Sequence, residues 1–207
     1  MKIDKTGIID EALKLLNEVG IDALSTRLLA ERLGVKQPAL YWHFRSKRAL
    51  LDAMNDEMLR RGHQHRWPAD GEDWKDFLRD NARSFRHALL AYRDGARVHA
   101  GTEASPEDLA NPEAHIRILV DAGAGPELAI EILVSISRYV VGCVLEEQAD
   151  IPDAAARGAK LDQAASEYPL TSKALGHYRS KGAEVFFDSG LMFILDGIVA
   201  RLKNLHS

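Results

Sequence analysis

Apolar residues recur every three to four positions along most of the chain, which is the spacing of helices that bury one face. From Lys5 to Val19 this pattern predicts a helix with a wide apolar stripe, and Gly20 is expected to end it. The stripe consists of Ile8, Ile9, Ala12, Leu13, Leu15, Leu16 and Val19. The sequence contains no convincing alternating strand pattern. The chain is therefore predicted to be all-α.

Residues 25–47, STRLLAERLGVKQPALYWHFRSK, predict two short helices joined by a tight turn. Thr26 is suited to cap the first helix. Gly34 follows that helix where a left-handed backbone is needed, which glycine adopts without steric cost. Pro38 suits the first position of the second helix, because its missing N–H is no loss there, and Gln37 precedes it as a weak cap. The second helix is predicted to be about two turns long.

The second helix, predicted over residues 37–43, presents the polar and aromatic side chains that a DNA major groove accepts. We expect Gln37 and Arg27 to reach base edges and Lys47 to bind a phosphate. The full predicted DNA-binding set is Arg27, Gln37, Pro38, Ala39, Tyr41, Trp42, His43 and Lys47. The alternative is a generic helical hairpin. In either case one or both of the two adjacent aromatic residues are expected to pack in the core.

The rest of the chain repeats the helical pattern with a few interruptions. Ser46 is suited to cap a helix that connects the DNA-binding end to a larger body. Helices are predicted over residues 47–62, 74–92, 126–148 and 183–202, with a short helix or turn over 93–102. A polar break is predicted at 66–73, and an alanine-rich stretch at 149–166 predicts a mobile loop. Helix-start signals at Ser105 and again just before Pro112 leave open whether that proline breaks the segment.

The last predicted helix carries more apolar surface than one outer helix needs to bury. Its apolar residues are Val185, Phe186, Phe187, Leu191, Met192, Ile194, Leu195, Ile198 and Val199. Pairing of the helices at 126–148 and 183–202 from two subunits would bury this surface in a symmetric dimer. A monomeric core is the alternative. We expect a homodimer that a charge at Leu191 or Leu195 disrupts.

Charge is unevenly divided along the chain, although the total is only −4. Residues 1–48 hold nine Lys and Arg against six Asp and Glu, a balance of +3, which leaves −7 for the remainder. Positive charge at the predicted DNA-binding end favours DNA binding there. No apolar run approaches the length of a membrane span and the N-terminus lacks a signal-peptide pattern, so we expect a cytoplasmic protein.

The sequence contains no enzyme signature: there is no Gly-x-Ser-x-Gly elbow, P-loop, Gly-x-Gly-x-x-Gly turn or Cys-x-x-Cys pair. Cys143 is predicted to be a buried small hydrophobe. His63 and His65 would face different sides of a helix, which makes them a weak metal signal. Asn81 lies in the apolar stripe of the helix at 74–92 and must therefore form a hydrogen bond, for which an internal partner is favoured over a ligand. We expect no enzymatic activity.

Residues 33–53, LGVKQPALYWHFRSKRALLDA, resemble the DNA-binding unit of the TetR family of transcriptional regulators. The stretches LLNEVGIDALSTR (15–27) and RSFRHALLAYRDGARVHAGT (83–102) also match that family, and the similarity weakens in the second half of the chain. The resemblance implies a three-helix helix-turn-helix head, residues 1–46, on an α-helical ligand-binding and dimerisation body, residues 47–207. It also implies a homodimeric repressor that binds a palindromic operator, is released by a small-molecule inducer and controls a drug efflux gene.

The resemblance further implies that the inducer enters as a chelate of a tetracycline with Mg2+. His99 is then expected to bind the metal directly, while Thr102 and, from the partner subunit, Glu146 act through metal-bound waters. The residues expected to bind the inducer are His63, Asn81, Phe85, His99, Thr102 and His115. Because a hard dication takes oxygen ligands that the drug and water can bring, the protein needs to supply only one or two groups.

Several positions depart from the family pattern in the half that receives the inducer. Glu103 and Ala104 replace an Arg-Pro pair, His115 replaces a glutamine, Arg138 stands at an uncharged position, and Pro112 interrupts a helix. These changes leave open a repressor that answers to a different, metal-independent small molecule. A hypothesis from another class is a small-molecule-binding or hydrolytic protein with a vestigial DNA head. Salt-sensitive, sequence-specific DNA binding would distinguish the repressor from that protein.

Overall fold

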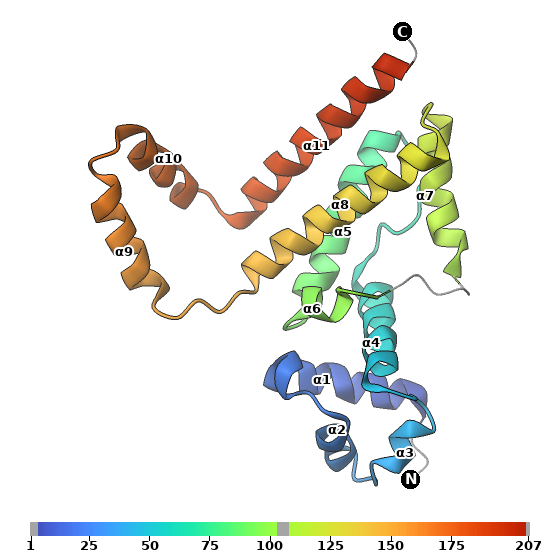
Figure 1. Ribbon diagram of the computed structural model, residues 1–207. Helices are drawn as coiled ribbons and strands as arrows, with labels where there is room; N and C mark the ends of the chain where they lie inside the picture. Colours follow the sequence, from blue (N-terminus) through green and yellow to red (C-terminus); the bar gives the residue numbers. More distant parts are fainter. Residues whose placement is uncertain (1–3, 103–107, 206–207) are drawn as a thin grey trace.

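The computed structural model describes residues 4–102 and 108–205, and these ranges contain eleven α-helices and no strand, as the all-α prediction requires. The helices are α1 (Lys5–Ala23), α2 (Thr26–Arg32), α3 (Pro38–Tyr41), α4 (Lys47–Gly62), α5 (Trp74–Leu90), α6 (Gly95–His99), α7 (Ala110–Asp121), α8 (Pro126–Glu147), α9 (Ala154–Ala165), α10 (Pro169–Ser180) and α11 (Ala183–Leu205). Figure 1 shows a small head, formed by α1–α3, that α4 joins to a larger body. The departures at Glu103 and Ala104 and the start signal at Ser105 lie outside the described residues.

The turns of the head are close to those predicted, with one change of capping residue. The helical geometry of α1 breaks at Gly20, where the sequence placed the helix end, although α1 resumes as far as Ala23. Ser25, rather than Thr26, caps α2: its hydroxyl oxygen accepts a hydrogen bond from the Leu28 N–H at 3.1 Å. Ser25 has the extended backbone of a capping residue, whereas its neighbour is already helical. Gly34 has a φ of +67°, as the predicted turn requires.

The helix expected to read DNA, α3, is shorter than predicted. It covers Pro38–Tyr41, and Gln37 makes no capping hydrogen bond with its side chain. Leu40 and Phe44, four residues apart, turn into the core. Trp42 lies between these two positions, faces the other way and is 90% exposed. The expectation that an aromatic residue of the adjacent pair would pack in the core was therefore wrong.

The connecting helix α4 is fixed at both ends. Ser46 caps it as predicted, since its hydroxyl oxygen accepts from the Ala49 N–H at 3.0 Å. At the other end Gly62 crosses α5 so closely that a Cβ added there would lie 2.8 Å from Ala88 Cα. Only glycine allows two backbones to approach in this way. The crossing therefore fixes the end of α4 that lies farthest from the head.

The body packs α5, α7, α8 and α11 around an apolar core. Ion pairs tie α5 to the long helices, with N–O distances between 2.5 and 2.9 Å: Lys75–Asp196, Arg83–Asp188 and Arg86–Glu147. Pro112 does not break α7, because it lies in the first turn, where a missing N–H leaves no hydrogen bond unmade. The predicted helix at 74–92 ends two residues early, at Leu90.

Residues 149–182 form an arm that projects from the body, with α9 and α10 side by side (Figure 1). The prediction of a mobile loop at 149–166 was therefore wrong. Ala165 is the one buried residue of α9, and α10 has none. A helix with no buried stripe shows no apolar period, so the pattern that revealed the other helices was missing here.

α8 is long and apolar enough to cross a membrane by length and composition, so the expectation that no apolar run reaches that length was wrong. One such helix is weak evidence of a membrane span, because a core helix passes the same test. α8 packs against α5, α6, α7 and α11. The residues it buries are Ala129, Ile132, Ile136, Val140 and Val144, which repeat at helical spacing. One face of α8 thus belongs to the core of the body, and the opposite face is open.

Candidate functional site

The predicted DNA-binding residues lie at the surface of the head around α3. The exposed members are Arg27, Pro38, Ala39, Tyr41, Trp42, His43 and Lys47. Gln37 is half-buried, because its side-chain amide nitrogen donates to Thr26 Oγ1 at 2.9 Å and lies 3.5 Å from the hydroxyl oxygen of Tyr41. Lys47 Nζ donates to the Ile21 carbonyl oxygen at 3.4 Å. This surface therefore combines exposed cationic and aromatic groups with one amide that other side chains hold.

A cavity of about 730 Å³ lies in the body, lined by residues of α4 to α8. Its lining contains the whole set of residues expected to bind the inducer: His63, Asn81, Phe85, His99, Thr102 and His115. The cavity is large enough for a drug-sized molecule. Side chains that are more than fifty positions apart in the sequence thus meet around one space. We call this space the ligand cavity.

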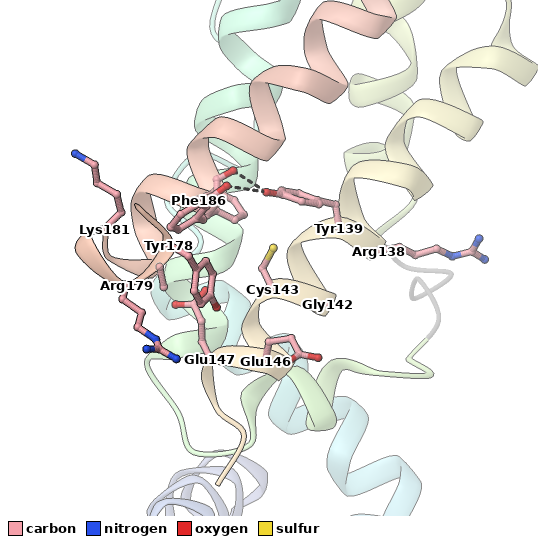
Figure 2. Close-up of a pocket in the computed structure, with 12 residues that line it drawn as sticks. Arg138, Tyr139, Gly142, Cys143, Glu146, Glu147, Tyr178, Arg179, Lys181 and Phe186 are labelled. Atoms are coloured by element: carbon pink, nitrogen blue, oxygen red, sulfur yellow. Dashed lines mark hydrogen bonds between the residues drawn. The ribbon is translucent and has the colours of Figure 1, made fainter. Parts of the chain in front are cut away.

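A neighbouring groove of about 640 Å³ lies between α8, α10 and α11 (Figure 2). Glu146 lines this groove and is absent from the described lining of the ligand cavity, whereas Arg138 lines both. Cys143, which the sequence predicted to be buried, is half-buried in the groove. Burial raises the pKa of its thiol, which therefore stays protonated and unreactive near neutral pH. Within one chain, Glu146 is not brought to His99.

A buried amide holds the ring of His99 at the end of α6. His99 Nδ1 lies 2.9 Å from Asn55 Oδ1, and Asn55 is only 4% exposed. Because an amide oxygen can only accept, Nδ1 carries the proton and Nε2 keeps a free lone pair. Burial lowers the pKa of His99, so the ring is neutral near pH 7. A neutral imidazole with a fixed tautomer can bind a metal ion or accept a hydrogen bond from a ligand.

Asn81 and His63 form a second polar group on the cavity wall. Asn81 Nδ2 donates to the His65 carbonyl oxygen at 2.8 Å and lies 3.4 Å from His63 Nε2, so the expected internal hydrogen bond is confirmed. His63 Nδ1 lies 3.0 Å from Ser84 Oγ. Burial lowers the pKa of His63 to about 3. The side chain of His65 turns away to Glu72, at 2.8 Å, and so joins no metal-binding set with His63.

His115 is the third neutral histidine of the cavity. Its Nε2 donates to the Arg66 carbonyl oxygen at 2.6 Å, which leaves Nδ1 as an acceptor. Burial lowers the pKa of His115 as well. Asn111 Nδ2 donates to the same carbonyl at 3.0 Å. The connection between α4 and α5 is therefore bound to α7, and three uncharged imidazoles surround the ligand cavity.

The donor set suits a magnesium ion that arrives with most of its ligands. His99 Nε2 offers one coordination position, and the nearby Thr102 hydroxyl donates to the His99 carbonyl oxygen at 2.7 Å. Among the described residues no group of three or more metal-binding side chains exists. Magnesium prefers six oxygen ligands and retains several waters. The cavity therefore fits a chelated ion better than a bare one.

α6 contacts the head at one end and the ligand cavity at the other. At its start, Asp94 Oδ2 accepts a hydrogen bond from the Ile21 N–H at 2.9 Å. Past its end, the Ala100 carbonyl oxygen accepts from Arg48 NH1, near the start of α4, at 3.2 Å. The two ends of this five-residue helix are thus hydrogen-bonded to α1 and α4. A movement at the cavity would reach both α1, in the head, and α4, which carries the head.

Sequence reasoning missed Thr26 and Asn55, which hold the amide of the DNA-binding surface and the histidine of the cavity. Asn55 lies four residues from both Leu51 and Leu59, on the apolar stripe of α4. An amide in an apolar stripe is the same signal that identified Asn81, so Asn55 could have been found. Thr26 gave no such signal, because its partner lies across a turn.

Two family models match this chain. The model described as bacterial regulatory proteins, tetR family, matches residues 8–54, and the tetracyclin repressor-like C-terminal domain matches residues 67–202. The chain belongs to the TetR family. Because TetR-family proteins are transcriptional regulators, the predictions of this family and of a protein without enzymatic activity are confirmed.

Known TetR proteins are similar to this chain over almost its whole length. It is 50% identical over 200 residues to tetracycline repressor protein class A from transposon 1721 of Escherichia coli, covering 97% of this chain and 92% of that protein. It is also similar to the crystal structure of TetR from Acinetobacter baumannii AYE, with 43% identity, a TM-score of 0.78 and coverage of 97% and 99%. A class A TetR in complex with 5a,6-anhydrotetracycline and magnesium has 44% identity, a TM-score of 0.72 and coverage of 93% and 96%.

Proposed function

We propose that this protein is a homodimeric transcriptional repressor that binds a palindromic operator through its head, residues 1–46. It leaves the operator when its body, residues 47–207, binds a tetracycline chelated to magnesium. The regulated gene encodes a drug efflux protein, and the repressor acts in the cytoplasm. The class A relatives support the choice of inducer, since one is a tetracycline repressor and one binds 5a,6-anhydrotetracycline with magnesium.

One observation carries this proposal: the side chains expected to bind the inducer line a single cavity, and His99 offers that cavity a free lone pair. The neutral state of the histidines supports it as well, because protonated imidazoles would repel a metal ion. The departure at His115 keeps one hydrogen-bond acceptor where the family has a glutamine. The cavity can therefore bind both the metal end and the remaining polar groups of a chelate.

In this proposal His99 Nε2 binds the metal, while Thr102 and Glu146 of the partner subunit act through water. His99 would hold the magnesium ion at the end of α6, and the ion would supply the positive charge that binds the oxygen atoms of the drug. The location of Glu146 on the groove of its own chain, away from His99, supports a contribution across the dimer. Asn81, Phe85 and His63 hold the part of the drug that carries no metal.

Transmission to the DNA uses the two contacts between α6 and α4. His99 is bound to Asn55, and Ala100 is bound to Arg48. A ligand that draws the segment 98–102 toward itself changes both contacts and tilts α4, which carries the head. The operator accepts one spacing of about 34–36 Å between recognition helices, so a small tilt weakens binding. Complete switching requires about 10⁴-fold, or about 5.5 kcal/mol, of differential affinity for the released state.

Exposed apolar side chains on the two long helices support the homodimer. Phe193 on α11 is 77% exposed, and Ile130 and Leu145 on α8 are also exposed. Leu191 and Leu195, which the sequence suggested as dimer contacts, are instead 1% and 0% exposed, because they pack within their own chain. A charge at either position would disrupt the core itself. Phe193 is therefore the better position at which to test the dimer.

The deciding experiment follows release of a fluorescent operator duplex against tetracycline concentration, with magnesium present and with magnesium removed by a chelator. We expect release only with magnesium. His99→Ala should retain operator binding and lose magnesium-dependent release. Asn81→Ala should weaken the binding of the drug, whether or not magnesium is present. Glu113→Ala, an exposed change on α7 outside the cavity lining, is the control. If tetracycline does not bind the unmodified protein in the presence of magnesium, the choice of inducer is wrong.

The second candidate is the same repressor answering to a metal-independent small molecule. The observation that favours it is that no carboxylate belongs to the described lining of the ligand cavity, although magnesium prefers oxygen ligands. Operator release by a compound without chelating oxygens, after magnesium has been removed, would establish this candidate. Sequence-specific, salt-sensitive DNA binding would exclude a protein with a vestigial head in both cases.

A further inference from the structure

The charges on the wall of the ligand cavity all have one sign. Among the described residues that line it there is no Asp or Glu, whereas two arginines, Arg66 and Arg138, are present. The histidines of the wall add no negative charge, and most of the remaining lining is apolar. A charge beside an apolar space is poorly screened by water. The described part of the wall therefore favours an anionic group on the ligand near these arginines.

The two arginines differ in their partners. Arg66 donates to Asp108 Oδ2 at 2.9 Å, so a carboxylate outside the lining compensates its charge. Arg138 is exposed and makes no ion pair or hydrogen bond with any other residue that the structure describes. Figure 2 shows its side chain extended from α8 on the side that faces away from Tyr178 and Phe186. Arg138 is thus the uncompensated charge of the cavity wall.

We propose that Arg138 selects inducers that carry an anionic group, such as a carboxylate, on a planar polycyclic frame. The proposal rests on the proposed function, since it takes the cavity to be the inducer site. The rings lie against the apolar lining, which includes Leu133 and Val141, and the anion lies at the exposed guanidinium. A guanidinium matches a carboxylate through two parallel N–H donors.

The test uses two fluorescent tricyclic probes that differ only in charge, anthracene-2-carboxylate and anthracene-2-carboxamide. Their affinities for the full-length protein are measured by fluorescence titration without DNA and without magnesium. We expect the carboxylate to bind about two- to fivefold more tightly, which is the upper part of the range that exposed ion pairs provide. Raising the salt concentration should reduce this preference, because salt screens exposed charges. Equal affinities for the two probes would overturn the proposal.

Variants identify the residue responsible. Arg138→Gln should bring the carboxylate to the affinity of the amide, and Arg138→Lys should retain part of the preference because the positive charge remains. Lys181→Gln is the matched control, because it removes the same charge from a residue that lines only the groove. A carboxylate preference that survives in Arg138→Gln, or that disappears in Lys181→Gln, would assign the effect to other charges.

Two further measurements are needed. The first asks whether Arg138 contacts the ligand or the partner subunit. The second tests the selection of anionic ligands separately from the proposal that tetracycline is the inducer. Sedimentation of Arg138→Gln should show an unchanged dimer, and dissociation would mean that Arg138 pairs with a carboxylate of the partner subunit, which overturns the proposal. Operator release by tetracycline with magnesium is measured in parallel on the unmodified protein. Failure of that release together with an intact carboxylate preference would reject the tetracycline assignment and support charge selection by Arg138.

Discussion

The DNA-binding surface and the ligand cavity present their polar groups in opposite ways. Around α3, seven of the eight predicted residues are exposed, and the charged ones stand at the surface. In the cavity, the three histidines and Asn81 are half-buried and each is bound to another part of the chain, as His99 is to Asn55 and His115 is to Arg66. The histidines there are neutral because burial lowers their pKa values.

The difference follows from the ligands that the two regions are proposed to bind. A DNA duplex is large and highly charged, so long-range attraction and many weak contacts suffice, and flexible exposed side chains can adapt to it. A small molecule offers only a few polar atoms, so the protein must fix its own donors and acceptors beforehand. Gln37 is the exception on the DNA side, since Thr26 and Tyr41 hold its amide.

The largest expected effect comes from removing the dimer, on which both regions depend. Phe193→Asp places a charge on an apolar side chain that is 77% exposed in the single chain and is proposed to be buried in the dimer. We expect monomers by analytical ultracentrifugation and a loss of about 10²–10⁴-fold in operator affinity, because each head would bind its half-site alone. Val120→Asp, on the exposed side of α7, should leave the dimer intact. A dimeric Phe193→Asp protein would contradict the proposed interface.

The next effect sharpens the comparison inside the cavity. Asn55→Leu keeps the volume of the side chain but removes the acceptor that fixes the His99 tautomer. We expect affinity for the magnesium–tetracycline chelate to fall about 10–100-fold, as for other changes behind a metal ligand. Binding measured after removal of magnesium should change far less. Equal losses in both conditions would mean that Asn55 only supports the packing of α4.

On the DNA side, Gln37→Ala should cost about 1–3 kcal/mol of specific binding and relax the preference at one base pair per half-site. Thr26→Val removes the group that holds the Gln37 amide and should reproduce part of this loss. Lys47→Ala should instead weaken all sequences alike and reduce the salt slope by about one. The measurement is a salt titration of binding to operator and random duplexes. The assignment fails if Gln37→Ala and Lys47→Ala have the same effect on both duplexes.

The smallest effect concerns the pH dependence of stability, which the cavity should dominate. The pKa of His63 is about 3 in the folded chain and 6.5 for the free side chain. The unfolded state therefore binds more protons as the pH falls below about 6.5, and His63 should reduce the unfolding free energy by up to about 1.4 kcal/mol per pH unit. Urea unfolding between pH 7.5 and 5 measures this slope. His63→Asn should flatten it, whereas His43→Asn, at the exposed DNA surface, should not.

Apolar periodicity predicted most of the fold, and it failed where burial is absent. The long helices α4, α5, α8 and α11 were found because each buries a stripe in the core. α9 was missed because a single residue of it, Ala165, is buried. The exposure of Trp42 could not be predicted from its residue type. Leu40 and Phe44 occupy the core on the other side of this segment, and Trp42 therefore faces solvent. Leu191 of α11 was likewise expected at the dimer interface, but it is buried within its own chain. The sequence shows that α11 has apolar residues on more than one face, and it does not show which face packs inside the chain.

The candidate cavity residues came mainly from the family resemblance rather than from spacing. Asn81 was the exception, since an amide on an apolar stripe needs a partner, and it has one in the His65 carbonyl. His63, His99 and His115 are scattered along the chain, and no pattern of neighbours marks them as one group. Their common surroundings arise only when α4 to α8 pack together. The positions at 103 and 104, where the family pattern changes, lie outside the described residues.

The close crossing of Gly62 and Ala88 holds one end of α4 in place, so α4 can rotate about that fulcrum as a rigid body. The sixteen residues of α4 place its other end, at Lys47, about 23 Å from that fulcrum. Over this length, which follows from the rise of an α-helix, a rotation of about 5° would displace the head by about 2 Å. In a symmetric pair the two swings add, so the half-site spacing of about 34–36 Å would change by about a tenth. Because α4 rotates about Gly62, a shift near His99 that is smaller than a bond length becomes a larger displacement of the head. That displacement no longer matches the half-site spacing of the operator.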